Sequence, residues 1–190
     1  KSKIIFPLIA IFIFLIGYFS FEEFKKKNRT KMANQYNSVI LNFNDGDKIN
    51  TVNELINMIE KKDATYSPLA LYFLIDNNLI EEKNKINELF DILINKKNLQ
   101  KEIKNLIIYK KALYNSDIIS ENELLQILNP VINSESIWKP HALYLVAEYF
   151  YSKKQTEKSK EFFNKILSLP NVNKDIQLES KKRLTRDLSE

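Results

Sequence analysis

Eighteen consecutive residues near the start of the chain, from Ile4 to Phe21, carry no charge. As an α-helix with a rise of 1.5 Å per residue, this run is about 27 Å long, close to the hydrocarbon thickness of a bilayer. Aromatic side chains gather at its C-terminal end, where they favour the boundary with lipid headgroups. The run therefore predicts a transmembrane helix, with a span that includes Ile4, Phe6, Leu8, Ile11, Phe14, Gly17 and Phe21.

Two other interpretations of this segment fit the residues less well than an anchor does. A cleaved signal peptide has a shorter apolar core followed by small residues, and the stretch from Tyr18 to Glu22 offers no such cleavage site. A buried core helix is disfavoured because the run has no polar face for water. We therefore expect an anchor with a basic flank over residues 1–31 and a water-soluble domain over residues 32–190.

The net charge of +5 belongs to the N-terminal part of the chain. Residues 1–31 hold seven Lys or Arg and two Glu, whereas residues 32–190 hold 22 basic and 22 acidic side chains. A neutral domain gains little from releasing counterions off a phosphate backbone, so we do not expect it to bind nucleic acid. The basic stretch is expected to meet anionic lipid headgroups, with an acidic or ribonucleic partner at the bilayer surface as the alternative. It consists of Lys25, Lys26, Lys27, Arg29 and Lys31.

The orientation of such an anchor follows from the basic residues at its two ends. Two precede the uncharged run and five follow it, and the positive-inside tendency would put the domain in the cytoplasm. The sequence begins with Lys and not Met, so the first count is a lower bound.

After the basic stretch, apolar residues recur at spacings of three and four, which is typical of amphipathic helices. A juxtamembrane helix is expected to end near Phe43, followed by a turn over residues 44–47. Pro68 and Pro140 suit first-turn positions, Pro130 should kink or shorten its helix, and Ser67, Ser120 and Thr156 are candidate caps. The chain is therefore predicted to be all-α, with eight or nine helices around residues 52–59, 69–73, 86–93, 103–113, 124–132, 138–151, 156–169 and 173–188.

An internal recurrence suggests a repeat architecture. The sequence from Pro68 to Tyr72 returns 72 positions later in a similar form as Pro140 to Tyr144, and half of that separation is close to the length of a helix-turn-helix repeat. The last pair is the clearest, because small residues at Ala147 and Ser159 would let its helices approach closely. Phe150 and Phe163 would fill the groove beside them, Lys154 stands where Gly is usual, and the first pair has Ile75 and Ile86 at the small-residue positions. The pattern predicts a tetratricopeptide-like superhelix of helical hairpins.

On these motifs the chain resembles the bacterial membrane-anchored tetratricopeptide-like family typified by the ancillary subunit of the SecYEG translocon. The resemblance rests on the Gly-aromatic stretch Leu15 to Phe19, on Ala33 and Tyr36 in the juxtamembrane helix, and on the last pair, Ala142 to Pro170. It implies a single-pass protein of the bacterial inner membrane with a cytoplasmic N-terminus and a periplasmic domain. It also implies a role beside the translocon in handing exported proteins to chaperones. This implication decides the expected orientation against the charge count, and a cytoplasmic domain is the alternative.

Residues that could carry chemistry are few. The chain has no Cys, one His and two Gly, which excludes disulfides, thiolate metal sites and glycine-rich phosphate loops. His141 has no second His or Cys to work with and is expected to be a partly exposed first-turn residue. The acidic pairs Glu81–Glu82 and Glu121/Glu123 are explained by the helix dipole. We expect no enzyme activity, metal, cofactor or small-molecule substrate.

Aromatic side chains on the first helices of the pairs could bind an extended or helical peptide, although most should be core. The candidates for partner contact are Tyr72, Tyr109, Trp138, Tyr144 and Tyr149. Two functions follow: a membrane-tethered scaffold that binds translocon components, chaperones or clients, or a structural accessory subunit of a larger membrane complex that binds no client. An enzyme is a third class, and no assembled site supports it.

Overall fold

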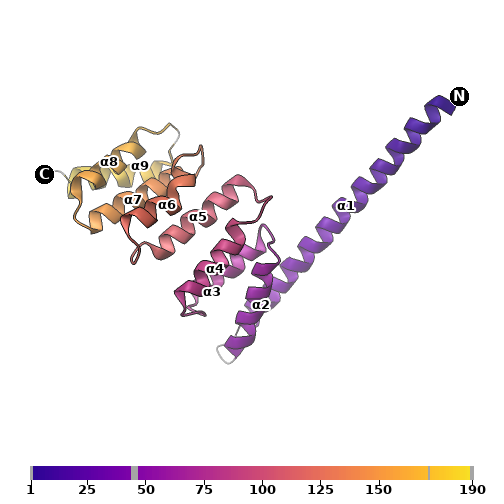
Figure 1. The fold of residues 1–190 in the computed structure, drawn as a ribbon, viewed down its shortest axis with the longest axis horizontal. Coiled ribbons are helices and arrows are strands. Elements are labelled where there is room, and N and C mark those ends of the chain that lie inside the picture. Colours follow the sequence, from indigo (N-terminus) through magenta and orange to yellow (C-terminus); the bar gives the residue numbers. More distant parts are fainter. Residues whose placement is uncertain (1, 44–46, 171, 189–190) are drawn as a thin grey trace. The chain divides into compact units, whose positions relative to one another are not determined.

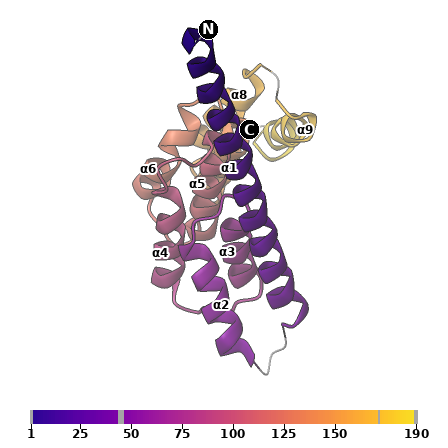
Figure 2. The ribbon, with the colours of Figure 1, turned by 90° about the vertical axis from the view of Figure 1, so that its right-hand side faces the viewer.

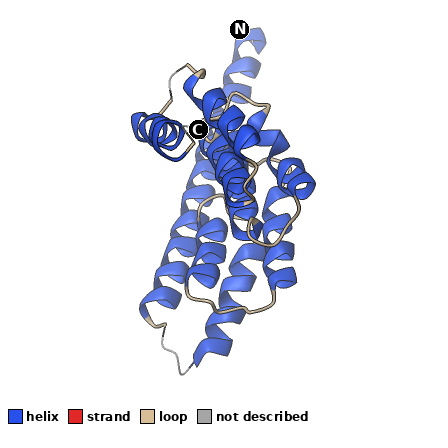
Figure 3. Ribbon diagram, turned by 90° about the vertical axis from the view of Figure 1, so that its left-hand side faces the viewer, coloured by secondary structure: helices blue, strands red, loops and turns tan. Residues whose placement is uncertain are grey.

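The structure is a computed structural model, and it describes residues 2–43, 47–170 and 172–188, with side chains from residue 11 onward. Within these residues every regular element is a helix and none is a strand, which confirms the all-α prediction (Figure 3). The chain divides into two compact units, with the boundary between Glu81 and Glu82. We call them the N-terminal and the C-terminal unit.

The N-terminal unit consists of three helices, α1 (Ser2–Leu41), α2 (Lys48–Glu60) and α3 (Tyr66–Asp76) (Figure 1). The last part of α1 lies beside α2 and α3, where Met32 and Val39 are buried (Figure 2). The Lys61 amino group donates a hydrogen bond of 2.9 Å to the side-chain oxygen of Gln35. α1 ends at Leu41, close to the predicted end near Phe43. The helix is unbroken up to that point because no Gly or Pro follows Gly17 within it.

The core of this unit lies between α2 and α3. Leu55, Met58 and Ile59 from α2 are fully buried, as are Ala70 and Leu71 from α3. Within α3 rather than at its cap, Ser67 is buried, and its hydroxyl donates a 2.6 Å hydrogen bond to the Met58 carbonyl. Its predicted role as a cap is therefore wrong: the side chain joins two helices instead.

The C-terminal unit contains six α-helices in which each packs against the next along the chain. In helical repeat proteins each unit contacts mainly its neighbours along the chain, so the architecture is compatible with a tetratricopeptide-like fold. The helices are α4 (Lys83–Ile94), α5 (Lys101–Asn115), α6 (Glu121–Ile132), α7 (Lys139–Ser152), α8 (Thr156–Leu167) and α9 (Lys174–Lys182), and α9 continues into a π-helical turn, η2 (Arg183–Asp187).

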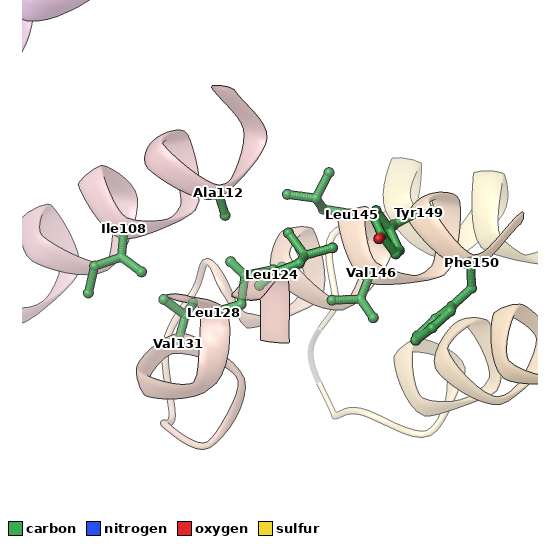
Figure 4. Close-up of a cluster of buried hydrophobic side chains, with 10 residues drawn as sticks. Ile108, Ala112, Leu124, Leu128, Val131, Leu145, Val146, Tyr149 and Phe150 are labelled. Carbon is green, nitrogen blue, oxygen red and sulfur yellow. The ribbon is translucent and has the colours of Figure 1, made fainter. Parts of the chain in front are cut away.

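A buried apolar cluster joins α5, α6 and α7 (Figure 4). Its members recur every three or four residues on each helix, so one face of each points inward. They are Ile108, Ala112, Leu124, Leu128, Val131, Ala142, Leu145, Val146, Tyr149 and Phe150. The same spacing of apolar residues predicted that these three segments are helices.

The hairpin of α7 and α8 matches its prediction closely. Ala147 and Ser159 are both fully buried, and the Ser159 hydroxyl donates a 2.9 Å hydrogen bond to the Ala147 carbonyl. A contact this short between a side chain and the opposite backbone requires small residues at both positions. Phe150 and Phe163 are buried on either side, as expected.

Two local predictions differ from the structure. The predicted first pair, 69–93, is divided by the boundary between the units, and α3 packs against α2 while α4 packs against α5. Thr156 is the first residue of α8, and Gln155 occupies the cap position. Pro130, which was expected to kink or shorten its helix, lies inside α6 two residues before its end at Ile132. The predicted turn at 44–47 lies mostly outside the described residues.

The predicted membrane span is described only in part. Ile4, Phe6 and Leu8 lie outside the residues whose side chains are described, while Ile11, Phe14, Gly17 and Phe21 lie on the exposed part of α1. Among the described residues, no helix has an apolar stretch of the length and hydropathy that crossing a bilayer requires.

Candidate interaction surfaces

His141 lies among aromatic rings, on the first turn of α7. Its ring centroid is 5.1 Å from that of Trp138 and 5.9 Å from that of Tyr109, and the Tyr109 and Trp138 rings lie 6.2 Å apart and nearly parallel. Burial lowers the pKa of His141. The imidazole lies in the partly exposed first-turn position that the sequence predicted.

Polar contacts hold these three rings in place. The Glu102 carboxylate of α5 accepts hydrogen bonds from the Ser136 hydroxyl at 2.7 Å and from the Ile137 backbone N–H at 3.2 Å. The segment before α7 is thereby tied to α5, which sets Trp138 against Tyr109. Next to it, the Ile137 side chain is 69% exposed. The arrangement forms a half-buried aromatic surface, which we call the Tyr109–Trp138–His141 cluster.

The remaining aromatic candidates occupy different environments. Tyr72 belongs to α3 in the N-terminal unit, where burial raises its pKa to about 12. Tyr149 is buried in the cluster of Figure 4, and its hydroxyl donates a 3.1 Å hydrogen bond to the Ile119 carbonyl. Of the five candidates, Tyr109 and Trp138 lie ring against ring, and both pack against the cluster that contains Tyr149. Tyr149 is 8% exposed, so nearly all of its surface is covered by the chain itself.

Tyr144 lies near a group of charged residues that the sequence did not reveal. Arg183 of η2 forms two hydrogen bonds with the Glu148 carboxylate, from Nε at 2.7 Å and from Nη2 at 2.8 Å. The same guanidinium donates to Asp187 at 2.8 Å and lies 4.9 Å from the centre of the Tyr151 ring. Tyr144, Glu148 and Tyr151 share one face of α7 because they are four and three residues apart. The sequence showed that face, but not that Arg183 returns to it.

The acidic pair Glu121/Glu123 has structural roles. Glu123 accepts a 2.8 Å hydrogen bond from the Ser120 N–H, and the Ser120 hydroxyl accepts one from the Glu123 N–H, so the two form a capping box at the start of α6. Glu121 accepts hydrogen bonds of 2.9 Å from Lys158 of α8. Glu82 precedes α4 as its cap residue rather than lying in its first turn. Among the described residues, no three acidic or His side chains are grouped so as to hold a metal ion.

The N-terminal half of α1 is exposed along its described length. Large apolar side chains between Ile11 and Phe24 are 44–72% exposed, and the basic residues Lys25, Lys26, Lys27, Arg29 and Lys31 follow them, also exposed. Met32 is the first buried residue after this basic stretch. Along its length α1 therefore has an exposed apolar part, an exposed basic part and a part that packs against α2 and α3.

Comparison with protein-family models, with curated proteins and with solved structures found no match.

Proposed function

We propose that the chain is a membrane-tethered scaffold for protein–protein interaction, held to the bilayer by residues 4–21 of α1. The observation that carries this proposal is the division of α1 between an exposed apolar half and a half that packs on α2 and α3. A single continuous helix would then couple the anchor directly to the N-terminal unit.

Lipid suits the apolar half better than a single helical partner does. The six consecutive residues Ile11 to Ile16 are all exposed, and six residues at 100° each surround a helix completely. A single packed helix would cover one side only, whereas a bilayer covers every side. Each side chain of this size contributes about 1.5–3 kcal/mol when it leaves water. The uncharged sequence continues upstream to Ile4 and gives a run of membrane-spanning length.

The basic stretch after the apolar half suits anionic lipid headgroups. Its five cations lie within seven residues on exposed helix, directly after the aromatic residues Tyr18, Phe19, Phe21 and Phe24. Each Lys or Arg close to an anionic surface contributes about 1 kcal/mol. The stretch would thereby fix the depth at which α1 leaves the membrane.

The scaffold role rests on the helical-repeat architecture and on the half-buried aromatic surface at Tyr109 and Trp138. Aromatic side chains of this kind are frequent anchors for bound peptides. From the family resemblance we assign the partners to the translocon, its chaperones or exported clients, and the domain to the periplasmic face of a bacterial inner membrane. Protease access to the domain in intact cells distinguishes this orientation from the cytoplasmic one.

Flotation with lipid vesicles tests the anchor. The full chain should float with vesicles and resist extraction at alkaline pH, and the paired changes Phe12→Asp and Phe14→Asp should abolish both. The matched control is Leu41→Asp with Ile49→Asp, because both side chains are at least 80% exposed in the same unit but lie outside the proposed anchor. Recovery of the full chain in the soluble fraction would refute the anchor.

Photo-crosslinking tests the scaffold role. A photoreactive residue in place of Ile137, beside Trp138, should give protein adducts in intact membranes, and one at exposed Asn164 on α8 should give few. Several different adducts are expected for a scaffold that binds clients. One constant adduct would instead identify an accessory subunit of a fixed complex, and no adduct at Ile137 would contradict both functions.

A further inference from the structure

The C-terminal segment α9–η2 lies over the face of α7 that carries Tyr144, Glu148 and Tyr151. Its main polar contact is Arg183, which forms two parallel hydrogen bonds with Glu148 and lies over the Tyr151 ring. A bidentate pair between a guanidinium and a carboxylate is geometrically selective, and a lysine cannot reproduce it. The face of α7 is therefore shaped for an arginine.

Two leucines that follow this arginine in the sequence make apolar contacts with the rest of the unit. Leu188 is buried in a cluster with Leu143 and Phe163, and Leu184 packs against the same cluster while half-exposed. Counted from Arg183, the two leucines stand one and five positions later. A short arginine–leucine pattern thus accounts for the principal contacts that hold η2.

The packing of α9 itself is incomplete. Ser180 is fully buried, yet its hydroxyl has no hydrogen-bond partner, whereas the equally buried hydroxyl of Ser159 has the Ala147 carbonyl. A buried polar group without a partner costs about 1–3 kcal/mol. On the same helix, Leu178 is 53% exposed. Few buried apolar contacts and an unsatisfied hydroxyl are the properties of an element that opens locally at low cost.

From these observations we propose that the Tyr144–Glu148–Tyr151 face of α7 is a docking surface for an amphipathic helix of a partner protein, with an arginine followed by leucines one and five positions later. The chain's own α9–η2 segment occupies this surface and is displaced when the partner binds. The inference rests on the proposed scaffold function, for which it names the chemistry of a partner.

Charge and shape together favour this partner chemistry. Glu148 supplies the anion, and its carboxylate accepts two hydrogen bonds from the Arg183 guanidinium. With α9–η2 displaced, Glu148 would lose this cation and remain on the helix face that also carries Tyr144 and Tyr151. Such a site rejects acidic helices by charge repulsion and gains little from apolar ones, which leave the carboxylate unpaired.

A peptide of residues 173–188, labelled with a fluorophore, tests the docking surface in trans. The receptor is the full chain carrying Arg183→Ala and Leu188→Ala, which removes the two main contacts of the endogenous segment. We expect this variant to bind the peptide at least tenfold more tightly than the wild-type chain does, as measured by fluorescence anisotropy. Replacing the peptide's arginine with glutamine should weaken binding at least tenfold.

Matched variants separate docking from non-specific adhesion. Adding Glu148→Gln to the receptor should reduce affinity for the arginine peptide and leave affinity for the glutamine peptide nearly unchanged. Adding Glu157→Gln, on the exposed first turn of α8, should change neither. Equal binding of both peptides, or no binding by a receptor whose circular dichroism shows intact helices, would overturn the proposal.

Hydrogen exchange covers the case in which the receptor variant fails to fold. In the wild-type chain, excess arginine peptide should accelerate exchange of the α9 amides and leave those of α5 unchanged, and no acceleration would refute displacement. Vesicle flotation and crosslinking at Ile137 are independent of this surface. If the chain floats with vesicles and crosslinks at Ile137 but does not bind the peptide, the docking surface alone is rejected. If it neither floats nor crosslinks, the proposed function is rejected.

Discussion

Ser159 and Ala147 lie at the closest approach of α7 and α8, where neither residue has any exposed surface. Ser159→Leu adds a large side chain where no space exists and removes the hydrogen bond to the Ala147 carbonyl. We expect the free energy of unfolding to fall by about 2–4 kcal/mol. Chemical denaturation measures the change. Asn164→Leu, exposed on the same helix, should stay within about 0.5 kcal/mol of wild type, and an equal loss in both would contradict the packing described.

Lys154 has a positive backbone φ of 59° immediately after α7. Its N–H bonds to the Tyr151 carbonyl and the next N–H, that of Gln155, bonds to the Phe150 carbonyl, which is the Schellman pattern that favours Gly. Lys154→Gly should therefore raise the free energy of unfolding by about 1 kcal/mol. The control is Asn95→Gly, at the end of α4 with φ −82°, which should give no gain. A destabilised Lys154→Gly protein in the same denaturation assay would refute this account.

Sequence reasoning identified some caps and not others, for a physical reason. Ser120 is followed three residues later by Glu123, which completes a capping box, whereas Thr156 is followed by Ser159, which cannot. A Ser or Thr before a helix is therefore weak evidence for a side-chain cap unless a Glu or Gln follows three residues later. Ser67 was misassigned because its bond to the Met58 carbonyl depends on how two helices pack. Contacts such as Arg183 with Glu148 were likewise beyond prediction, since the two residues are 35 positions apart.

At the scale of elements, the capping box of α6 leads to a prediction on pH. The hydrogen bonds from the Ser120 side chain and backbone lower the pKa of Glu123 below its usual 4.5. A carboxylate with a lowered folded-state pKa stabilises the fold above its unfolded pKa, and this contribution is lost as the pH falls through the folded-state pKa. Ser120→Ala should cost about 1 kcal/mol at pH 7.

The difference between wild type and Ser120→Ala should narrow as the pH falls below 4.5, because protonated Glu123 no longer accepts the charge-assisted hydrogen bond from the Ser120 hydroxyl, which only the wild type has. Thermal unfolding at pH 7 and pH 3 measures this difference. Thr156→Ala serves as the control, since Thr156 makes no capping bond and its loss should have little effect at either pH. A Ser120→Ala deficit independent of pH would argue against the role assigned to Glu123.

The positions of the helices could be predicted from apolar spacing, but their pairing only in part: α7 pairs with α8 as predicted, whereas the predicted first pair does not form. The recurring segments at 68–72 and 140–144 bury the same positions, Ala70 and Leu71 in α3 and Ala142 and Leu143 in α7. Local burial is therefore shared, yet α3 packs on the helix before it and α7 mainly on the helix after it. Ile75 and Ile86 already indicated a weak first pair, because they are large where close packing needs small residues.

At the scale of the whole molecule, the account depends on what covers the exposed apolar half of α1. The sequence alone predicted a membrane span there, on length and absence of charge. The described structure adds that the later part of the same helix packs on α2 and α3, with Met32 and Val39 buried. The anchor and the N-terminal unit would therefore share one continuous helix. No comparable apolar exposure on consecutive residues occurs elsewhere in the described chain.

The most direct test is the depth of position 14 in a bilayer, because the chain contains a single Trp at position 138. Phe14→Trp in a Trp138→Phe background places one fluorophore on α1, and the wild-type chain places one on α7. In vesicles whose acyl chains carry bromine, the fluorescence of Trp at position 14 should be blue-shifted and strongly quenched, and that of native Trp138 should not. Equal emission from position 14 with and without brominated lipid would contradict the membrane anchor.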